Sequence, residues 1–475
     1  MVVFTGERRS ITREPVQAPK TVESHFKFKV KTLTGSVNLW FLIFSEGKHK
    51  LSAHDFLTYW SLVLRFWSFH VHILQLRRSL LLLQGLILDM ANTLNYSKSP
   101  AGEAKFALQL FGQLAKSESD RNIVLSPSSI RTGLALAYLG ADGSTADELK
   151  LGLGLEGAGK NEVAEKLAQL LAKGQWEKTS GDKVGPKLKY ANRIFVAQRL
   201  QLAQAYQDLL SKNFASAAEN VNFTQSADTA KRINSWVEEQ THQQIKDLIG
   251  PDSVNADTAA ILVNAIYFKA DWQTSFPDYA TYASDFVNHG GRKVSVDTMS
   301  QEGFFRFGEL SELKAKVLEL SYTGTDIVFL IILPQEEQGL AFIEDKLMDI
   351  DLNEIRAQLS RRKVRVQLPK FKFEFHVPLQ AALEELGIKQ LFSPGANLSS
   401  LLRESEPLHI SEVKHKAIIE INENGTIASG ASYVNVAVES LLIGEEVFEF
   451  TADHPFFFAI KDAQNTLLLG HVSQL

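Results

Sequence analysis

The chain of 475 residues contains no cysteine, which excludes disulfide bonds and thiolate metal sites. Long apolar runs are also missing. The longest in the first 89 residues, residues 80–88, is interrupted by Gln84 and Gly85 and falls far short of the roughly 18 residues of a membrane-spanning helix. Hydrophobic residues nevertheless make up 45% of the chain, enough for one large core or two ordinary ones.

Sequence signatures of catalysis are absent too. Neither a G-x-S-x-G elbow nor an H-E-x-x-H zinc motif occurs, and the adjacent Glu384 and Glu385 point away from each other on a helix. The glycines at 152, 154 and 157 spell G-x-G-x-x-G, but no strand precedes them, so a turn between helices is the better interpretation. We expect no enzyme, no cofactor and no metal.

A basic run, Arg361-Arg362-Lys363, is interpreted as the solvated end of a helix rather than as a nucleic-acid site. The first 89 residues carry twelve Lys and Arg against six Asp and Glu, a net charge of +6 that leaves −11 for the remainder of a chain with −5 in total. We expect this extension, residues 1–89, to be disordered or not part of the natural product, and residues 90–475 to form one domain.

The stretch from Thr426 to Glu439 has the composition of a strand and the position of a loop. Every second residue is small or β-branched and uncharged, the period-two pattern of a strand with one buried face. The stretch nevertheless lies between the turn at Glu423-Asn424-Gly425 and Gly444-Glu445-Glu446, where an exposed loop is expected. Such a segment can enter a packed sheet only if its inward side chains are small and uncharged. The inward positions are Thr426, Ala428, Gly430, Ser432, Val434, Val436 and Val438.

At these residues the chain resembles the serpin family. The segment from Glu423 to Ala431, E-N-G-T-I-A-S-G-A, is similar to the family's hinge E-x-G-T/S-x-A-x-x-A, although Ile427 and Gly430 depart from its commonest residues. Residues 450–456, F-T-A-D-H-P-F, are similar to its closing signature F-x-A-x-x-P-F, and residues 122–130 to N-I-x-x-S-P-x-S-I. The resemblance covers about residues 95–475. It implies an α+β serpin fold with a large central β-sheet, surrounding helices, smaller sheets and an exposed reactive-centre loop at about residues 424–447.

Periodicity predicts the elements that such a fold needs. The continuously apolar residues 259–272 predict a central strand, Ser126 and Pro127 predict a capped helix start, and Thr145 with Glu148 predicts a capping box. Further helices are expected at residues 101–116, 202–214, 230–248 and 378–386. Further strands are expected at residues 188–196, 293–299, 315–322, 326–334 and 364–375 and within 448–474.

The resemblance implies a suicide-substrate inhibitor with a metastable native fold, which traps a serine endopeptidase, or alternatively a cysteine endopeptidase, as a covalent acyl-enzyme when the cleaved loop inserts into the central sheet. The alternative is a non-inhibitory carrier or chaperone, whose inserting face usually carries bulky or charged residues. Family spacing puts the reactive bond at Glu439-Ser440, with Leu441 or Leu442 as alternatives. The implied hinge residues are Glu423, Gly425, Thr426, Ala428, Gly430 and Ala431, and the implied polar cluster that controls sheet opening is Ser126, Ser129, Asn264 and His415.

The expected partner is the target endopeptidase, with no nucleic acid and no membrane, and the chain is expected to be monomeric. Most of the family is extracellular, and we expect that compartment. The absence of a signal peptide at Met1 or Met90 favours the cytoplasm as the alternative.

Overall fold

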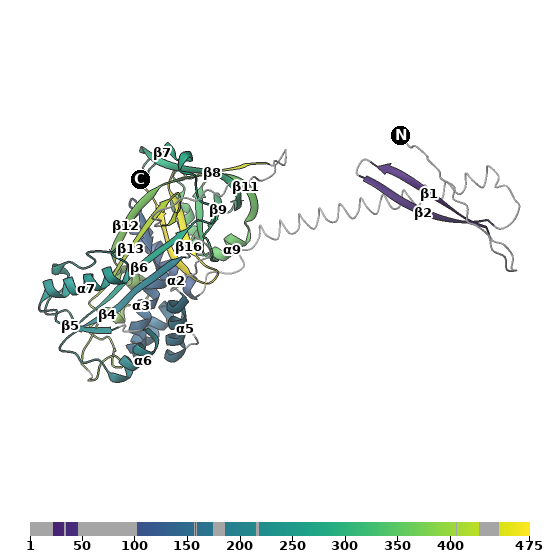
Figure 1. The fold of residues 1–475 in the computed structure, drawn as a ribbon. Helices are drawn as coiled ribbons and strands as arrows, with labels where there is room; N and C mark the ends of the chain where they lie inside the picture. The colour runs from purple at the N-terminus through teal and green to yellow at the C-terminus, as the bar shows by residue number, and fades with distance from the viewer. Residues whose placement is uncertain are drawn as a thin grey trace, which may run out of the picture. The chain divides into compact units, whose positions relative to one another are not determined.

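The computed structural model describes residues 22–32 and 35–45, and residues 102–475 with gaps at 156, 158, 174–185, 215–217, 405 and 427–445. Contacts within the chain divide it into two compact units, Met1–Asn95 and Tyr96–Leu475. The first unit holds an antiparallel hairpin of β1 (Val22–Thr32) and β2 (Gly35–Ser45). The elements described below all belong to the second unit (Figure 1).

A six-stranded mixed sheet has the order β12-β13-β14-β6-β4-β5. Two of its pairs are parallel, β13 with β6 and β4 with β5, and its other pairs are antiparallel. Its strands are β4 (Lys187–Ala197), β5 (Ala218–Val221), β6 (Ala260–Asp271), β12 (Phe371–Pro378), β13 (Glu412–Asn422) and β14 (Gly425–Thr426).

A second sheet has nine strands in the order β15-β11-β8-β9-β10-β16-β17-β3, with β7 paired to β8 off this path. Its strands β10, β16 and β17 are buried along their whole length. The strands are β3 (Ile123–Leu125), β7 (Tyr282–Val287), β8 (Lys293–Leu310), β9 (Ala315–Ser321), β10 (Val328–Pro334), β11 (Ser360–Pro369), β15 (Phe448–Thr451), β16 (Phe456–Lys461) and β17 (Thr466–Val472).

Helices surround the two sheets (Figure 1). The helices of the described part are α2 (Gly102–Ser117), α3 (Pro127–Gly140), α4 (Gly143–Gly152), α5 (Lys160–Lys173), α6 (Gln204–Phe214), α7 (Ser226–Gln240), α8 (Leu340–Leu347), α9 (Leu352–Ala357) and α10 (Gln380–Glu385). Short 3-10 turns lie at Pro251–Ser253, Asp278–Ala280 and Gln390–Phe392. Within the residues that the structure describes, no helix is both long and apolar enough to cross a membrane.

Helices cover both faces of the six-stranded sheet. Successive side chains of a strand point to opposite faces. In β4, Asn192 faces α3, since the Ser129 hydroxyl of α3 donates to its Oδ1, whereas Phe195 packs edge-on against Trp236 of α7. β6 between these layers is almost wholly buried, which explains why its sequence is continuously apolar.

Four predictions about elements are wrong. The helix expected at residues 230–248 is α7, which ends at Gln240 because His242, Gln243 and Asp247 have left-handed φ angles of 51°, 64° and 50° that a right-handed helix cannot contain. The strand expected at residues 364–375 is two strands in different sheets, because the chain leaves β11 at Pro369 and enters β12 at Phe371.

The other two wrong predictions concern the polar residue Thr145 and the basic run at residues 361–363. Thr145 does not cap a helix: α4 begins at Gly143, and the buried Thr145 hydroxyl accepts from the backbone N–H of Asn397 at 2.9 Å. Arg361-Arg362-Lys363 is not a helix end but lies in β11, where it pairs with β8.

Candidate functional site

The first residues of the expected hinge, Gly425 and Thr426, lie inside the six-stranded sheet. After β13 the chain turns at Glu423-Asn424 and returns as β14, which pairs with β13 on one side (Ile421 with Thr426) and with β6 on the other (Thr426 with Ala270). Further along, β13 and β6 pair directly with each other, from Glu412 with Ile261 to Ala417 with Ile266. At one end of the sheet, β14 therefore lies between β13 and β6. Further along, β13 and β6 are direct neighbours.

Residue 425 has to be glycine because β14 lies very close to the backbone of β6 at this position. A Cβ atom at Gly425 would lie 2.0 Å from the carbonyl oxygen of Ala270 and 2.8 Å from the Cα of Asp271. Both atoms belong to the backbone of β6, so no side-chain rotation relieves the clash. Only glycine fits where β14 enters the sheet.

Thr426 is the last described residue before the gap at 427–445, and it is fully buried. Its hydroxyl lies 2.5 Å from the Tyr322 hydroxyl, and burial raises the pKa of that phenol well above its usual value. The Tyr322 ring stacks on Trp272, with centroids 4.6 Å apart and an angle of 14° between the planes. An aromatic pair therefore supports the point from which further insertion would start.

The turn before β14 is held by backbone and side-chain bonds. The Trp272 indole N–H donates to the carbonyl of Asn422 at 3.0 Å, and the Trp272 backbone N–H donates to that of Asn424 at 2.8 Å. The Glu423 carboxylate accepts from the Thr281 hydroxyl at 2.8 Å and pairs with the Lys370 ammonium at 3.0 Å. Burial alone would raise the pKa of Glu423, but hydrogen bonds from its own backbone, Lys370 and Thr281 outweigh it and lower the pKa below 4.5.

A polar cluster lies between α3 and the middle of the same sheet. Ser126 caps α3: its hydroxyl accepts from the Ser129 N–H at 3.2 Å, and its own N–H donates to His415 Nε2 at 3.1 Å. Asn264 lies between the other members because it pairs in register with His415 of β13 and with Asn192 of β4. Ser126, Ser129, Asn264 and His415 thus come together, but Ser129 bonds Asn192 rather than Asn264.

Several polar atoms of this cluster have no hydrogen-bond partner among the described residues: Nδ2 of Asn192, Nδ2 and Oδ1 of Asn264, and Nδ1 of His415. Burial lowers the pKa of His415 to about 3, so the imidazole is neutral at physiological pH. Because Nε2 accepts a hydrogen bond, the proton of the neutral ring resides on Nδ1. Buried polar groups without partners are rare and costly, so this sheet carries a local energetic penalty.

Sequence reasoning missed Asn192 and Gly133, which complete the cluster. A Cβ atom at Gly133 of α3 would lie 1.9 Å from Asn264 Oδ1, so the helix approaches β6 closely only because this residue is glycine. The amide of Asn192 within a strand of otherwise apolar inward positions was the available signal. The role of Gly133 has no counterpart in the local sequence pattern, because it depends on a contact with a strand 131 residues away.

The remaining predicted loop residues lie outside the described part of the chain. These are the hinge positions Ala428, Gly430 and Ala431 and the reactive-bond candidates Glu439, Ser440, Leu441 and Leu442. The chain is described again from Glu446, just before β15.

Comparison with known proteins agrees with this geometry. The family model for serpins, described as serine protease inhibitors, matches residues 101–475. Serine protease inhibitor 42Dd of Drosophila melanogaster is 39% identical over 364 residues, covering 77% of this chain and 94% of that protein. Leukocyte elastase inhibitor of Bos taurus is 36% identical over 384 residues, covering 78% of this chain and 98% of that protein.

A solved structure of cleaved Serpin 42Da is similar in fold, with a TM-score of 0.69 and 37% sequence identity, and covers 78% of this chain and 97% of that one. The α+β architecture, the hinge between two strands and the matched sequence all point the same way. The chain belongs to the serpin family.

Proposed function

We propose that this serpin inhibits a serine endopeptidase as a suicide substrate. The protease serine attacks the carbonyl carbon of the reactive bond, the peptide bond breaks, and the amino group of the next residue leaves with the C-terminal fragment. The loop remains attached to the protease as an acyl ester. Insertion of the freed loop between β13 and β6 then removes the protease from its productive geometry before water can hydrolyse the ester.

The observation that carries this proposal is the position of β14. Gly425 and Thr426 already separate β13 from β6 at one end. The two strands still pair directly with each other over residues 412–417 of β13 and 261–266 of β6. Continued insertion replaces one parallel strand pair by two antiparallel ones. The sheet gains a full ladder of backbone hydrogen bonds, and the small inward side chains become buried.

Continuing the observed register brings one loop residue to the polar cluster. Thr426 pairs with Ile421 and Ala270; six residues further, the same register pairs Ser432 with His415 on one side and Asn264 on the other. The inserted Ser432 hydroxyl can both donate and accept. It is therefore suited to satisfy the polar atoms of Asn264 and His415 that have no partner before insertion.

The reactive bond that we favour is Glu439-Ser440, which implies a protease that prefers acidic residues. Cleavage after Leu441 or Leu442 would instead suit an enzyme with an apolar primary pocket. From Thr426 to Glu439 an inserted strand spans about 45 Å. A protease attached at Glu439 would accordingly be carried along the whole length of β13.

The proposal is tested by incubating the protein with proteases of Glu, Leu and Arg preference. We expect a complex that survives denaturing electrophoresis, together with a released peptide whose mass begins at Ser440. Cleavage without any complex would contradict the inhibitory function. If the released peptide begins at Leu442 or Ile443, the inhibitory function stands and the reactive bond lies after Leu441 or Leu442.

A monomer working in the extracellular space, where most of this family acts, fits the proposal. The carrier alternative gains no support from the inserting face, whose sequence is small and uncharged at every inward position.

A further inference from the structure

Two arginines at the start of β11 carry positive charge that the described part of the protein does not neutralise. Arg361 and Arg362 are both exposed, and neither forms an ion pair with a described carboxylate. The Arg361 guanidinium carbon lies 5.2 Å from the centre of the Phe304 ring, and that of Arg362 lies 5.7 Å from the Phe448 ring. Stacking on aromatic faces orders the side chains in advance. Arg362 Nε donates to the Ser360 hydroxyl at 3.0 Å, and the other guanidinium N–H groups of the two arginines remain at the ring edges.

The basic residues next to these two are already paired. Lys363 and Arg365 both bind Glu302, at 3.2 and 3.0 Å, and Arg365 also binds Glu449 at 2.7 Å. The local excess of positive charge is thus concentrated on Arg361 and Arg362.

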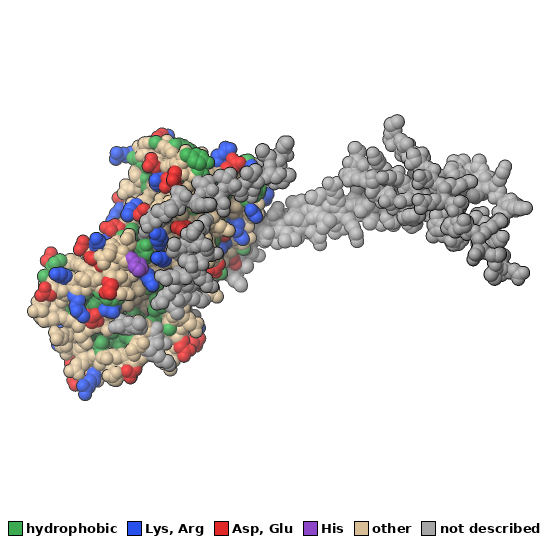
Figure 2. All heavy atoms as spheres, viewed as in Figure 1, with side chains coloured by type: hydrophobic (Ala, Val, Ile, Leu, Met, Phe, Trp, Pro, Cys, Tyr) green, Lys and Arg blue, Asp and Glu red, His purple; other side chains and the backbone are tan. Residues whose placement is uncertain are grey.

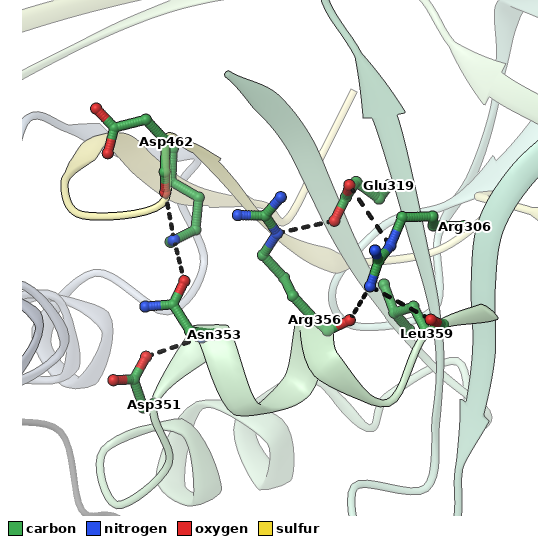
Figure 3. Close-up of polar contacts among 8 residues, drawn as sticks. Arg306, Glu319, Asp351, Asn353, Arg356, Leu359 and Asp462 are labelled. Atoms are coloured by element: carbon green, nitrogen blue, oxygen red, sulfur yellow. Dashed lines mark hydrogen bonds and ion pairs between the residues drawn. The ribbon is translucent and has the colours of Figure 1, made fainter. Parts of the chain in front are cut away.

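A second group of arginines near β11 has internal partners (Figure 3). Arg356 of α9 donates to the buried Glu319 at 2.8 Å. Arg306 lies 3.7 Å from the same carboxylate and donates to the carbonyls of Arg356 and Leu359. These side chains hold α9 and the start of β11 together, so they are not available to a partner.

The position of the two stacked arginines relates them to the reactive loop. Phe448, which supports Arg362, is the first residue of β15, the strand that follows the loop. Ser440 precedes Phe448 by eight residues, and eight residues reach at most about 28 Å. A protease domain of about 240 residues has a radius of gyration of about 18 Å, so an enzyme seated on that bond extends over this end of the sheet.

We propose that Arg361 and Arg362 form a secondary contact surface for the target protease, where they receive carboxylates of its surface near the active site. This inference rests on the inhibitory function proposed above and adds to it a determinant of target choice. The arginines act on the encounter, because exposed charges accelerate association more than they strengthen the final complex. The target is accordingly a protease with an acidic patch beside its substrate cleft.

The charge pattern favours a protein partner over a linear polyanion. A polyanionic chain is bound best by a continuous run of unpaired basic groups. Here Glu302 and Glu449 neutralise the neighbouring Lys363 and Arg365, and basic and acidic side chains are interspersed over the described surface that Figure 2 shows. A surface of mixed sign suits a partner that presents separate carboxylates at fixed positions.

The test uses a double variant, Arg361→Gln with Arg362→Gln, and whichever of chymotrypsin, pancreatic elastase and a glutamate-specific endopeptidase forms the stable complex. The rate constant of complex formation is measured at about 50 mM and about 500 mM salt. A matched control, Lys105→Gln with Lys116→Gln, removes two exposed charges from α2, which packs against α3 and β17. The double variant Arg361→Lys with Arg362→Lys keeps the charge and removes the planar guanidinium.

We expect the Gln variant to associate about three- to tenfold more slowly at low salt and to lose most of the salt dependence. Its melting temperature and its yield of complex should equal those of the unmodified protein, the control should change the rate less than about twofold, and the Lys variant should lie between. Equal rates for the Gln variant and the unmodified protein at both salt concentrations overturn this inference alone. A second outcome would also overturn the inference: heparin accelerates complex formation by every protein except the Gln variant, while without heparin the Gln variant and the unmodified protein react at equal rates. That result would assign the surface to a polyanion. If no protease forms a complex with any variant, the inhibitory function fails and this inference fails with it.

Discussion

Asn264 and His415 are buried polar residues whose side chains are only partly satisfied in the described structure. Among the described residues, the Asn264 amide has no hydrogen-bond partner and the His415 ring is bonded only through Nε2. Each unmade hydrogen bond of a buried group costs about 1–3 kcal/mol. The native sheet therefore carries an energetic cost at the point that an inserting strand has to pass.

Replacement of Ser432 by Ala should change the cleaved form and leave the native form unaffected. In our account the hydroxyl meets Asn264 and His415 only after insertion, so its loss should destabilise the cleaved protein by about 1–3 kcal/mol. Denaturant unfolding of both forms measures this, with Ser429→Ala, an outward position of the loop pattern, as the control. Equal losses in the native and cleaved forms would show that Ser432 does not enter the cluster on insertion.

The Glu423 carboxylate should stabilise the native hinge in a pH-dependent way. Its pKa is lowered in the folded protein, so its contribution is present above the ordinary value of 4.5 and is lost as the pH falls through the lowered value. We expect Glu423→Gln to lower native stability at pH 7 by about 1–2 kcal/mol. The difference from the unmodified protein should shrink in acid.

Denaturant unfolding between pH 7 and pH 3 measures both effects. The control is Glu420→Gln, which removes a more exposed ion pair with Lys372 and should cost less than about 1 kcal/mol. A constant difference between Glu423→Gln and the unmodified protein across this range would contradict the assignment.

The short strand β14 is the element on which the mechanism depends. It is two residues long, it is buried, and it has strands on both sides. Its alternation continues into the loop sequence, so the pattern that makes Thr426 an inward residue also makes Ala428 and Gly430 inward residues once the loop inserts.

A charge at the start of insertion should convert the inhibitor into a substrate. Thr426→Arg would place a guanidinium against Tyr322 between two paired strands, a desolvation cost of several kcal/mol. Slower insertion lets hydrolysis win, so the number of inhibitor molecules consumed per protease should rise by about tenfold or more. Titration of the protease measures it, with Thr426→Ser as the control that keeps the hydroxyl. If Thr426→Arg inhibits with the stoichiometry of the unmodified protein, the buried place of residue 426 between β13 and β6 does not control insertion.

Helices and strands could be predicted where the spacing of apolar residues along the sequence matches the faces that are buried in the structure. β6 has a continuously apolar sequence because it is buried almost throughout, with α3 packed against it, and the cap of α3 follows from Ser126 and Pro127 alone. The end of α7 was not predictable, because the left-handed residues His242 and Gln243 carry no Gly or Pro signal. The separation of β11 from β12 depends on which sheet each strand joins, and a single apolar run does not encode that choice.

The unit Tyr96–Leu475 joins two sheets through a chain that passes from one to the other several times. The α+β class followed from the family resemblance and the pattern of apolar strands and helices, whereas the assignment of strands to sheets follows only from long-range pairing. The hinge and the polar cluster were predicted through family resemblance, yet Asn192 and Gly133 emerged only from the structure. Their part in the site depends on the close approach of α3 to β6, a tertiary contact that local sequence does not report.

The central claim of the proposed mechanism is that the native fold is metastable because β13 and β6 still pair directly with each other, at positions that an inserted loop would separate. The most direct test is to melt the native protein and the protein cut once in the loop by limited proteolysis. Insertion of about ten residues with small buried side chains should raise the melting temperature of the cut form by about 10 °C or more. A cut form that melts at or below the temperature of the native protein would contradict the account.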